Sequence, residues 1–532
     1  MNENHVPDGN DATTPNTAHV APGVFRSLLF RGSNAAEPEL GQTEPECFHD
    51  LNLDQVVAAI THDLGEYDLT PFFRTPLTDL ETIHYRHRIF RDLEDETVHG
   101  HLTAFAAALT QMRAQWKQAT EMRDAWQRRF WMLRAHHTYQ DAIVAFADHL
   151  THDDLASDGL RDFREHLTGY AGSDAFGELV RRRTAVERAL DAVRYCVQIN
   201  GNKVTVTPFD DQPDYGAEVE ETFAKFRQGD VRSHLVKYNE YLEMNHVEAS
   251  VLALVAQSNP DAFGALQSYT DEHSAFIDRG VARFDREAHF YLGYRAYVRR
   301  LQEHDLPVCY PTVSDTKQVH ATESFDIALA HKLIDDGKRI VTNDFALSGD
   351  ERIIVVTGAN QGGKTTFSRA FGQLHYLAAL GCPVPGRDAE LFLADHIFTH
   401  FEKEEDIHSL SGKLEDELVR IHDILGRATG ASIVIMNEIF TSTSLDDAIL
   451  LGTAVLRQLI ERDTICVCVT FVDELSTLSD TTVSMVATVE EADAASRTYR
   501  VVPRPADGLA HAVAIAEKYG LTFERLTERI GS

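Results

Sequence analysis

At 532 residues the chain is longer than one typical core, so about two or three domains are expected. Its 83 acidic and 50 basic residues give a formal net charge of -33, which repels nucleic acid on average and argues against a simple DNA-coating role; any DNA contact needs a local basic surface. The six cysteines have no signal-peptide context, and no apolar run reaches about 18 residues, so we expect a soluble cytoplasmic protein with reduced thiols and no membrane span.

Residues 1–47 are expected to form a disordered tail and a short apolar segment. Residues 1–22 are polar and lack periodic apolar positions, so they cannot bury enough surface to become ordered. The apolar segment, residues 25–30, is expected to pack against the chain's own body, and docking on a partner is the alternative.

Residues 48–320 are predicted to form a mostly helical domain. Segment 195–209 differs, because alternating apolar residues flank Asn200-Gly201, a pattern typical of a β-hairpin. Apolar residues at helical spacing predict long amphipathic helices over residues 105–116, 122–149, 176–194, 231–255 and 281–301.

The composition changes between residues of about 305 and 340, where two prolines end helical structure. Beyond this boundary, short apolar runs alternate with helical patterns. Residues 321–532 are therefore predicted to form an α/β domain with a largely parallel sheet, edged by antiparallel strands near 483–489 and 499–502. The expected inner strands are residues 353–357, 432–436 and 465–470.

Residues 353–366 place an apolar strand directly before a glycine-rich turn. The spacing from Gly358 through Gly363 to Lys364 and Thr365 fits the P-loop, whose backbone N–H groups, opening helix and lysine cradle the phosphates of a nucleotide. A helical pattern follows, so strand, loop and helix come in the required order. We therefore expect ATP here; a turn that binds nothing is the alternative. The predicted binding residues are Gly358, Gly362, Gly363, Lys364, Thr365 and Thr366.

A second apolar strand, residues 433–436, ends in Asn437-Glu438. NTPases with a P-loop need a lysine for the β- and γ-phosphates, groups near Mg²⁺, and a residue that activates water. Lys364 supplies the first, Thr365 and Asn437 are the candidate Mg²⁺ ligands, and Glu438 is the candidate base. The alternative for Glu438 is a simple cap on a buried strand.

Together these motifs resemble the MutS family of mismatch-repair ATPases. Asn360 precedes Gly363 by three residues, as an Asn does in that family's phosphate loop, and is therefore expected to bind nucleotide. Asn437-Glu438-Ile439 is similar to the family's Asp-Glu-Ile. Thr443-Ser444, followed by Asp447, is similar to the family's Gly-Thr-Ser and the Asp that follows it. Residues 406–418 resemble its signature loop, with Ser409 and Glu417 at the Ser and Glu positions.

The resemblance covers most of residues 48–520, closely after residue 350 and loosely before it. It implies a helical core and lever domain followed by a P-loop ATPase domain of the MutS/ABC type. It also implies a homodimer with composite sites, in which Ser409 serves the γ-phosphate of the partner's nucleotide. Leu410-Ser411-Gly412 resembles the ABC-type signature as well, which makes Ser411 the alternative serine.

Three departures from the family pattern change the expected chemistry. Asn437 stands where the family has the metal-side Asp, so Mg²⁺ binding should weaken. Phe471 follows Val469-Thr470 where the family has a His, so hydrolysis is expected to be slow or differently gated. The residues before the core are too few for the family's mismatch-reading and connector domains.

Two functions from different classes remain open. The resemblance implies an ATP-operated clamp with a DNA-dependent ATPase, which binds double-stranded or branched DNA without sequence specificity in repair or recombination. The alternative is a nucleotide-dependent switch that acts on a protein partner without binding DNA or hydrolysing ATP quickly. Asn437, Phe471 and the acidic balance motivate this alternative.

Three other groups of residues carry weaker predictions. Cys466 and Cys468 are expected to be buried thiols of a strand, with a metal site as the alternative. Residues 149–154 contain two His and two Asp residues that are expected to be a solvated cluster or else a metal site. Arg181-Arg182-Arg183 is expected to be a solvated helical face, or else a phosphate contact.

Overall fold

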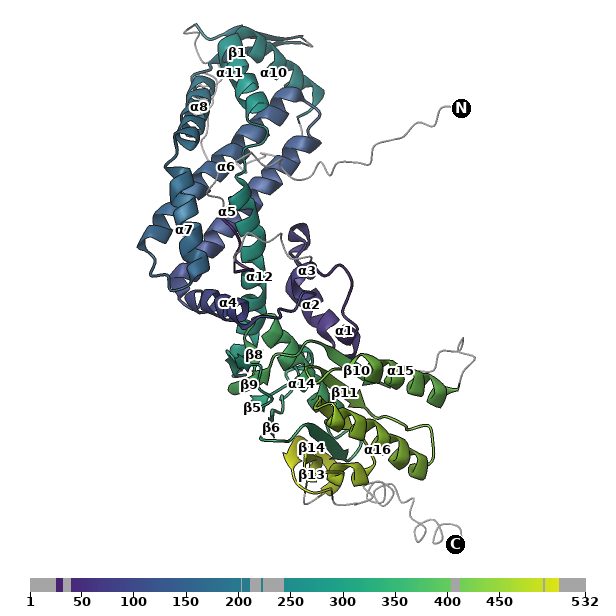
Figure 1. Ribbon diagram of the computed structural model, residues 1–532. Coiled ribbons are helices and arrows are strands. Elements are labelled where there is room, and N and C mark those ends of the chain that lie inside the picture. The colour runs from purple at the N-terminus through teal and green to yellow at the C-terminus, as the bar shows by residue number, and fades with distance from the viewer. Residues whose placement is uncertain are drawn as a thin grey trace, which may run out of the picture. The chain divides into compact units, whose positions relative to one another are not determined.

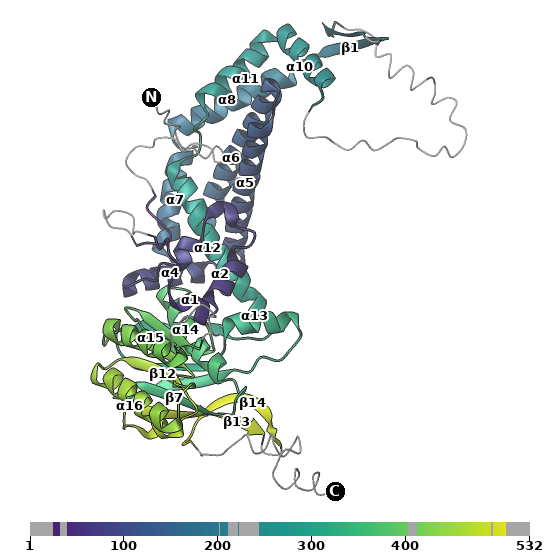
Figure 2. The ribbon, with the colours of Figure 1, turned by 90° about the vertical axis from the view of Figure 1, so that its right-hand side faces the viewer.

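The computed structural model describes residues 25–31, 40–201, 203–210, 222, 244–402, 412–490 and 493–506, and only the backbone of residues 493–496 (Figures 1 and 2). Contacts between Cα atoms divide the chain into two compact units. The domain boundaries expected at residues 47 and 320 stay predictions. Unit 1 comprises Met1–Phe25, Glu96–Asp154 and Arg161–Asp285, and unit 2 comprises Arg26–Asp95, Leu155–Leu160 and Arg286–Ser532.

Unit 1 is built of long helices and one hairpin. Two of its helices, α5 (Glu96–Glu121) and α6 (Ala125–His152), form an antiparallel pair, and the Asp124 carboxylate caps α6 by accepting the Gln127 N–H. The remaining helices are α7 (Asp158–Ala171), α8 (Asp174–Asp191), α10 (His246–Ser258), α11 (Pro260–Glu272) and the start of α12 (Arg279–Gln302). Four of the five expected helices are confirmed. The fifth, 231–255, falls partly outside the described residues and overlaps α10.

The expected hairpin is confirmed. Strands β1 (Tyr195–Asn200) and β2 (Lys203–Pro208) pair antiparallel, with Asn200 opposite Lys203. Gly201 has a φ of 61°, in the left-handed region that glycine adopts without steric cost.

The apolar segment near the N-terminus packs against the body of the chain, as expected. Phe25 is buried in unit 1, where its ring contacts Phe163 and Phe284 at centroid distances of 5.0 and 5.8 Å. Leu28 and Leu29 are buried in unit 2, and the Tyr291 hydroxyl donates a 2.6 Å hydrogen bond to the Leu28 carbonyl. The predicted tail, residues 1–22, lies outside the described residues.

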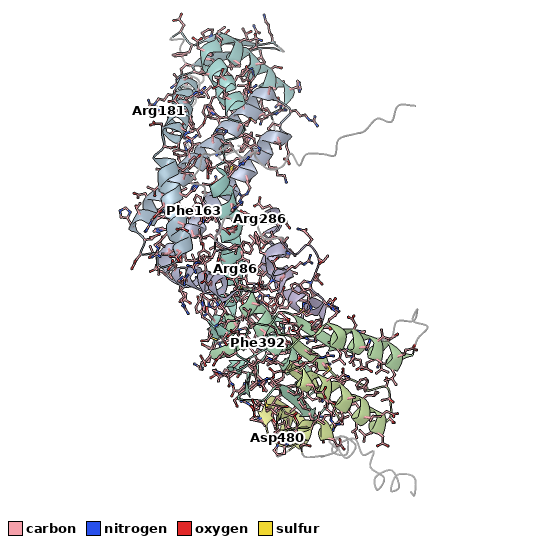
Figure 3. All side chains as sticks on the ribbon, viewed as in Figure 1. Arg86, Phe163, Arg181, Arg286, Phe392 and Asp480 are labelled. Carbon is pink, nitrogen blue, oxygen red and sulfur yellow. The ribbon has the colours of Figure 1, made fainter. Side chains whose placement is uncertain are left out.

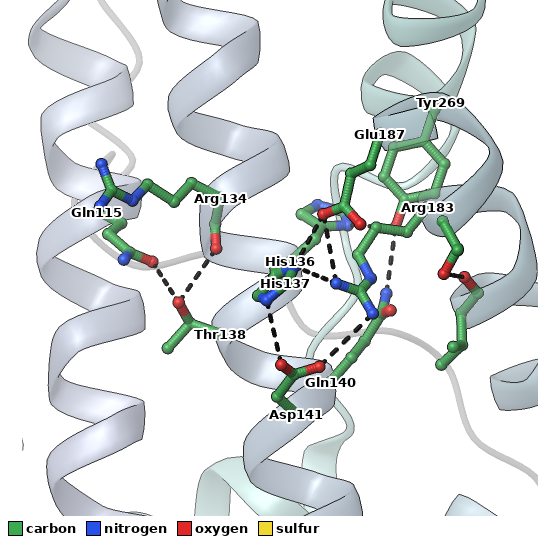
Figure 4. Close-up of polar contacts among 12 residues, drawn as sticks. Gln115, Arg134, His136, His137, Thr138, Gln140, Asp141, Arg183, Glu187 and Tyr269 are labelled. Atoms are coloured by element: carbon green, nitrogen blue, oxygen red, sulfur yellow. Dashed lines mark hydrogen bonds and ion pairs between the residues drawn. The ribbon is translucent and has the colours of Figure 1, made fainter. Parts of the chain in front are cut away.

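Two of the weaker predictions concern unit 1. Each of the three consecutive arginines of α8 has a carboxylate partner: Arg181 pairs with Glu178 and Arg182 with Glu272, both at 2.7 Å, while Arg183 is buried against Asp141, Glu187 and His137 (Figure 4). The suggested phosphate contact therefore has no support. His149 stacks on His101, which bonds Asp153, and no metal-holding group of His, Cys, Asp or Glu occurs among the described residues.

The α/β part of unit 2 has the expected largely parallel sheet. Its strand order is β10-β11-β12-β7-β13-β14, in which all neighbours are parallel except β13 and β14 at the antiparallel edge. The strands are β7 (Ile353–Gly358), β10 (Ile397–Phe401), β11 (Ile433–Asn437), β12 (Ile465–Val469), β13 (Thr482–Glu490) and β14 (Asp493–Pro503). Cys466 and Cys468 are fully buried in β12, as predicted, and burial raises the pKa of Cys468 to about 12.

Helices cover both faces of this sheet (Figure 2). On one face, α15 (Lys413–Arg427) and α16 (Leu445–Glu461) share an apolar cluster with Val434 and Met436 of β11. On the other face lies α14 (Lys364–Ala379), where a Cβ on Gly372 would stand 2.6 Å from the Ile435 side chain. Val434 and Met436 thus face α15 and α16 while Ile435 faces α14, because successive side chains of a strand point to opposite faces of the sheet.

A smaller four-stranded sheet and several short helices complete unit 2. The sheet has the order β4-β9-β5-β6, and β3 (Val308–Cys309) pairs with β8 (Val384–Pro385). Its strands are β4 (Thr312–Ser314), β5 (Val319–Ser324), β6 (Asn343–Leu347) and β9 (Asp388–Phe392). The helices are α1 (Cys47–Asp50), α2 (Leu53–Thr61), α3 (Thr70–Phe73), α4 (Leu80–Asp92) and α13 (Ile327–Asp335), with 3-10 turns at Gly65–Tyr67 and Asp473–Thr477. Nowhere in the described chain does a helix combine the length and apolarity needed to cross a membrane.

Arg86 of α4 is fully buried (Figure 3) and donates hydrogen bonds to two backbone carbonyls, Leu29 O at 2.9 Å and Leu380 O at 2.8 Å. Its guanidinium also lies over the rings of Phe30 and Phe290. Burial lowers the pKa of Arg86, since the charged form is separated from water. This one side chain therefore joins the N-terminal segment, α4 and the end of α14.

We expect Arg86→Ala to lower the free energy of unfolding by about 3 kcal/mol, because two buried carbonyls lose a charged donor and a cavity remains. Arg88→Ala on the same helix removes an exposed 3.6 Å ion pair with Asp158 and should cost less than about 1 kcal/mol. Urea denaturation followed by circular dichroism measures both. Equal losses would contradict the role given to Arg86.

Candidate functional site

The turn after β7 takes a conformation that requires glycine. Gly358 has a φ of 102° and Gly363 a φ of 96°. A Cβ on Gly358 would stand 2.6 Å from the Ala487 carbonyl oxygen, so any side chain would collide with the backbone of β13. The two glycines thus allow the turn to close tightly in front of α14, whose first residue is Lys364.

The Lys364 ammonium is held inside this turn. Its Nζ donates to Gly358 O at 2.9 Å, Ala359 O at 3.2 Å and the Asn360 Oδ1 at 3.1 Å. Burial lowers the pKa of Lys364, and the nearby Glu438 carboxylate opposes this shift. The turn therefore holds a positive charge at the N-terminus of a helix, which is the arrangement that binds phosphate.

Thr365 and Asn437 meet because parallel strands end at the same edge of a sheet. Asn437 is the last residue of β11, and the Thr365 hydroxyl donates to its Oδ1 at 2.9 Å. A hydroxyl oxygen and an amide oxygen are both acceptable Mg²⁺ ligands, although the amide brings no negative charge. This oxygen pair beside a phosphate loop fits a bound MgATP.

Glu438 follows directly and lies in a strained backbone. It has a φ of 57° and Phe440 a φ of 59°, both left-handed conformations without glycine. Each costs about 1–3 kcal/mol and persists only where the surroundings determine it. The Glu438 N–H donates to Val469 O of β12 at 2.9 Å, and the residue lines the same cavity as Lys364. Its carboxylate therefore shares the cavity with the lysine expected to bind phosphate.

The cavity at the phosphate loop has a volume of about 430 Å³ and extends beyond the predicted residues. Segment 325–343 forms part of its wall and contributes the apolar Leu329, Leu333 and Ile340 as well as the charged Asp326, Lys338 and Arg339. Tyr499 of β14 also lines it, with a φ of 59° and a half-exposed ring. Sequence reasoning missed this wall, because only the folded chain brings residues 325–343 and 499 to the phosphate loop.

Asn343 of β6 holds Tyr499 in place. Its side-chain Oδ1 accepts the Val501 N–H at 2.7 Å and its Nδ2 donates to Tyr499 O at 3.3 Å. The amide thus bonds the two peptide groups of β14 that directly follow the left-handed φ of Tyr499. No motif in the sequence identifies Asn343, since its partners are backbone groups more than 150 positions away.

The signature segment is only partly described. Ser409 and Ser411 lie outside the described residues, so neither register of the signature is tested. Glu417 is buried in α15, where its Oε1 accepts the Phe440 N–H at 2.7 Å. On the same helix, Ile421 and Leu425 pack on the sheet, while Leu418 is exposed.

The predicted residues in the described part of the chain gather at one edge of the sheet. The loop residues, Asn437 and Glu438 surround the cavity or bond to groups that do. Asp447 instead lies in the first turn of α16, where the Ser444 hydroxyl caps the helix by accepting the Asp447 N–H and donates to the Asp447 carboxylate. Phe471, in the place of the family's His, has a side chain that is 47% exposed.

Comparisons with known proteins agree with this geometry. Residues 354–526 match MutS domain V. A DNA mismatch repair protein MutS of Shouchella clausii is 31% identical over 211 residues, which cover 38% of this chain and 24% of that protein. A DNA mismatch repair protein MutS of Petrotoga mobilis is 36% identical over 119 residues, covering 22% and 15%. An Endonuclease MutS2 of Gemmatimonas aurantiaca is 28% identical over 206 residues, covering 38% and 25%. The chain thus matches about a quarter or less of the length of these relatives.

We expect Asn437→Asp to lower the Mg²⁺ concentration needed for half-maximal ATP binding by roughly tenfold, since a carboxylate adds negative charge beside Thr365. Titration of Mg²⁺ at fixed ATP measures the change. An unchanged Mg²⁺ requirement would show that residue 437 does not contact the ion.

Proposed function

We propose, from the membership of residues 354–526 in the MutS family, that this chain is an ATP-binding protein of DNA repair or recombination that hydrolyses ATP. The observation that carries the proposal is the single cluster of Lys364, the Thr365–Asn437 pair and Glu438 at the phosphate loop. These side chains come from the elements that the chemistry requires: Lys364, Thr365 and Glu438 line one cavity, and Asn437 bonds Thr365.

In the proposed reaction, the Lys364 ammonium leaves the loop carbonyls and binds the β- and γ-phosphates of ATP. The backbone N–H groups of the turn and the start of α14 bind the remaining phosphate oxygens. Glu438 accepts a proton from the water that attacks the γ-phosphorus, and the bond to the β-phosphate oxygen breaks to give ADP and phosphate. A Mg²⁺ ion held by Thr365 and Asn437 would neutralise part of the phosphate charge.

The apolar and aromatic lining residues of the cavity suit the base of the nucleotide. Tyr499 offers an aromatic ring, and Leu329, Leu333 and Ile340 contribute apolar surface to the same cavity. Pockets of this type bind flat heterocycles by burial and stacking. With the phosphates at Lys364, the base is therefore proposed to lie beside Tyr499.

Two features support slow or gated hydrolysis. Asn437 supplies no charge to the metal, and Phe471 has no imidazole to link the γ-phosphate to the rest of the molecule.

A homodimer with composite sites is proposed to gate the reaction through Ser409 or Ser411. Large apolar side chains exposed on unit 2, Leu445, Leu450 and Phe471, are consistent with a protein surface that is covered in such a dimer.

A local basic surface on unit 1 supports contact with DNA. Residues 113–134 comprise the end of α5, the short connection and the start of α6. They contain six basic and two acidic residues in a strongly acidic chain. Lys117, Arg123, Arg128 and Arg134 are exposed there, and the Arg134 guanidinium lies 5.4 Å from the centre of the Trp131 ring. Cations and a half-buried aromatic ring are the groups that bind nucleic-acid backbones and unpaired bases.

A nucleotide-dependent switch that acts on a protein partner is the second candidate. Asn437 and the exposed Phe471 favour it, since each replaces a group that speeds hydrolysis in the family. The two functions differ in their requirement for nucleic acid, because phosphate contacts make binding fall steeply with salt.

We expect Lys364→Ala to abolish nucleotide binding and turnover, because the phosphates lose their cation. Glu438→Gln should bind ATP normally and hydrolyse it at least roughly 100-fold more slowly, since an amide cannot accept the proton from water. Single-turnover hydrolysis with radiolabelled ATP measures both effects. Turnover of Glu438→Gln at the wild-type rate would disprove the assignment of the base.

We expect the double variant Arg128→Glu/Arg134→Glu to weaken binding to duplex or branched DNA by roughly tenfold or more and to reduce the salt dependence. The control Arg181→Glu/Arg188→Glu makes the same charge change on α8 of unit 1 and should have little effect. Fluorescence anisotropy over a range of salt concentrations measures both. Equal losses in the two variants would point to net charge alone, and no wild-type binding at low salt would favour the switch.

A further inference from the structure

The turn after β11 carries the proposed base, and two hydrogen bonds from neighbouring elements hold it. The Glu438 N–H bonds Val469 O of β12 at 2.9 Å, and the Phe440 N–H bonds the Glu417 Oε1 of α15 at 2.7 Å. Residues 438 and 440 both have left-handed φ angles. Because non-glycine residues keep such angles only under constraint, the second bond is needed to maintain the turn.

Glu417 is well placed to act as this constraint. It is 9% exposed, and its Oε1 also lies 3.4 Å from the Nε2 of His400, which is 2% exposed. His400 belongs to β10 and is paired in register with Met436, two residues before Glu438. Among the described residues, the Glu417 Oε2 and the His400 Nδ1 have no hydrogen-bond partner. The hydrogen-bond partners of the Glu417 carboxylate are thus the Phe440 peptide N–H and the His400 imidazole.

The start of α15 is tied to the same turn by a second route. Glu402 forms an ion pair with Lys413, the first residue of α15, and accepts the Thr441 hydroxyl at 3.3 Å. Two contacts therefore connect the first turns of α15 with residues 440 and 441. A shift of α15 relative to the sheet would pull on the backbone next to Glu438.

We infer that Glu417 is a positioning residue for Glu438, which it holds in the hydrolytic geometry through the Phe440 peptide, and that His400 keeps the Glu417 carboxylate in place. The inference rests on the proposed function, since it takes Glu438 as the base. Glu417 itself touches no reacting atom. Its contribution should therefore affect the rate of hydrolysis and leave nucleotide binding unchanged.

Two substitutions separate hydrogen bonding from packing. Glu417→Gln keeps an oxygen that accepts the Phe440 N–H, so the turn should persist and kcat should fall by less than about threefold. Glu417→Met fills similar volume without an acceptor, so the peptide N–H is left unpaired and kcat should fall by roughly tenfold or more. Glu415→Met, on the exposed side of the same helix, is the matched control.

The decisive experiment combines these variants with Glu438→Gln. Single-turnover hydrolysis of ATP and the Kd for a fluorescent ADP analogue are measured for each protein. If Glu417 acts through Glu438, Glu417→Met should slow the wild-type protein, leave the Kd within about twofold, and cause no further loss in the Glu438→Gln background. An equal loss in both backgrounds, or a wild-type rate for Glu417→Met, would overturn the inference.

Hydrogen exchange gives a readout that does not depend on hydrolysis. In Glu417→Met, peptides covering residues 437–446 should exchange faster than in the wild type, while peptides of the phosphate loop should exchange at the wild-type rate. In Glu417→Gln and Glu415→Met, exchange of residues 437–446 should stay close to that of the wild type. Unchanged exchange in the turn would also overturn the inference. If the wild-type protein does not hydrolyse ATP, the proposed function is wrong, whereas the exchange comparison still decides whether Glu417 holds the turn.

Discussion

Helix α14 begins in the phosphate loop, and buried hydrogen bonds along its length fix where that loop lies. Gln373 donates to Leu51 O at 2.8 Å and accepts the Ile327 N–H at 2.9 Å, while the Tyr376 hydroxyl donates to Phe73 O at 2.9 Å. These groups are out of contact with water, so each lost bond would leave a buried polar atom unsatisfied. The position of the helix is thus determined far from the phosphate loop, along a helix about 24 Å long.

This arrangement makes the N-terminal helices part of the unit that carries the phosphate loop. Gln373 and Leu51 are 322 positions apart in the chain, yet they are hydrogen-bonded in unit 2. Arg86 and Leu77 contact the backbone at the far end of α14 in the same way. A change in nucleotide state that moves α14 would therefore reach these helices directly.

The site itself combines a rigid phosphate loop with a turn under strain. Glycines make the loop conformation inexpensive, whereas Glu438 and Phe440 adopt similar left-handed angles at a cost. Hydrogen bonds from β12 and α15 offset that cost. The placement of the carboxylate thus depends on how the sheet and α15 pack. Position 437 carries an amide and position 471 an aromatic ring, where the resemblance predicts an Asp and a His.

The amino-acid sequence by itself determined the local elements and indicated the residues of the candidate site. The order of strand, glycine turn and helix around Lys364 needs only neighbouring residues, as does the hairpin at Asn200-Gly201, and both predictions of local structure are confirmed. Periodicity also located most long helices and the inner strands, because each buries one face. The amide at position 437 was also visible in the sequence, because the identity of a side chain does not depend on the fold.

The tertiary structure alone decided which distant residues share the cavity and which bond the turn that carries Glu438. Tyr499 and Asn343 meet the phosphate loop only after β14 and β6 are placed, and Glu417 reaches the Phe440 peptide only when α15 packs on the sheet. Their hydrogen-bond partners are backbone groups, which every residue has, so no pattern of side chains along the sequence can reveal them.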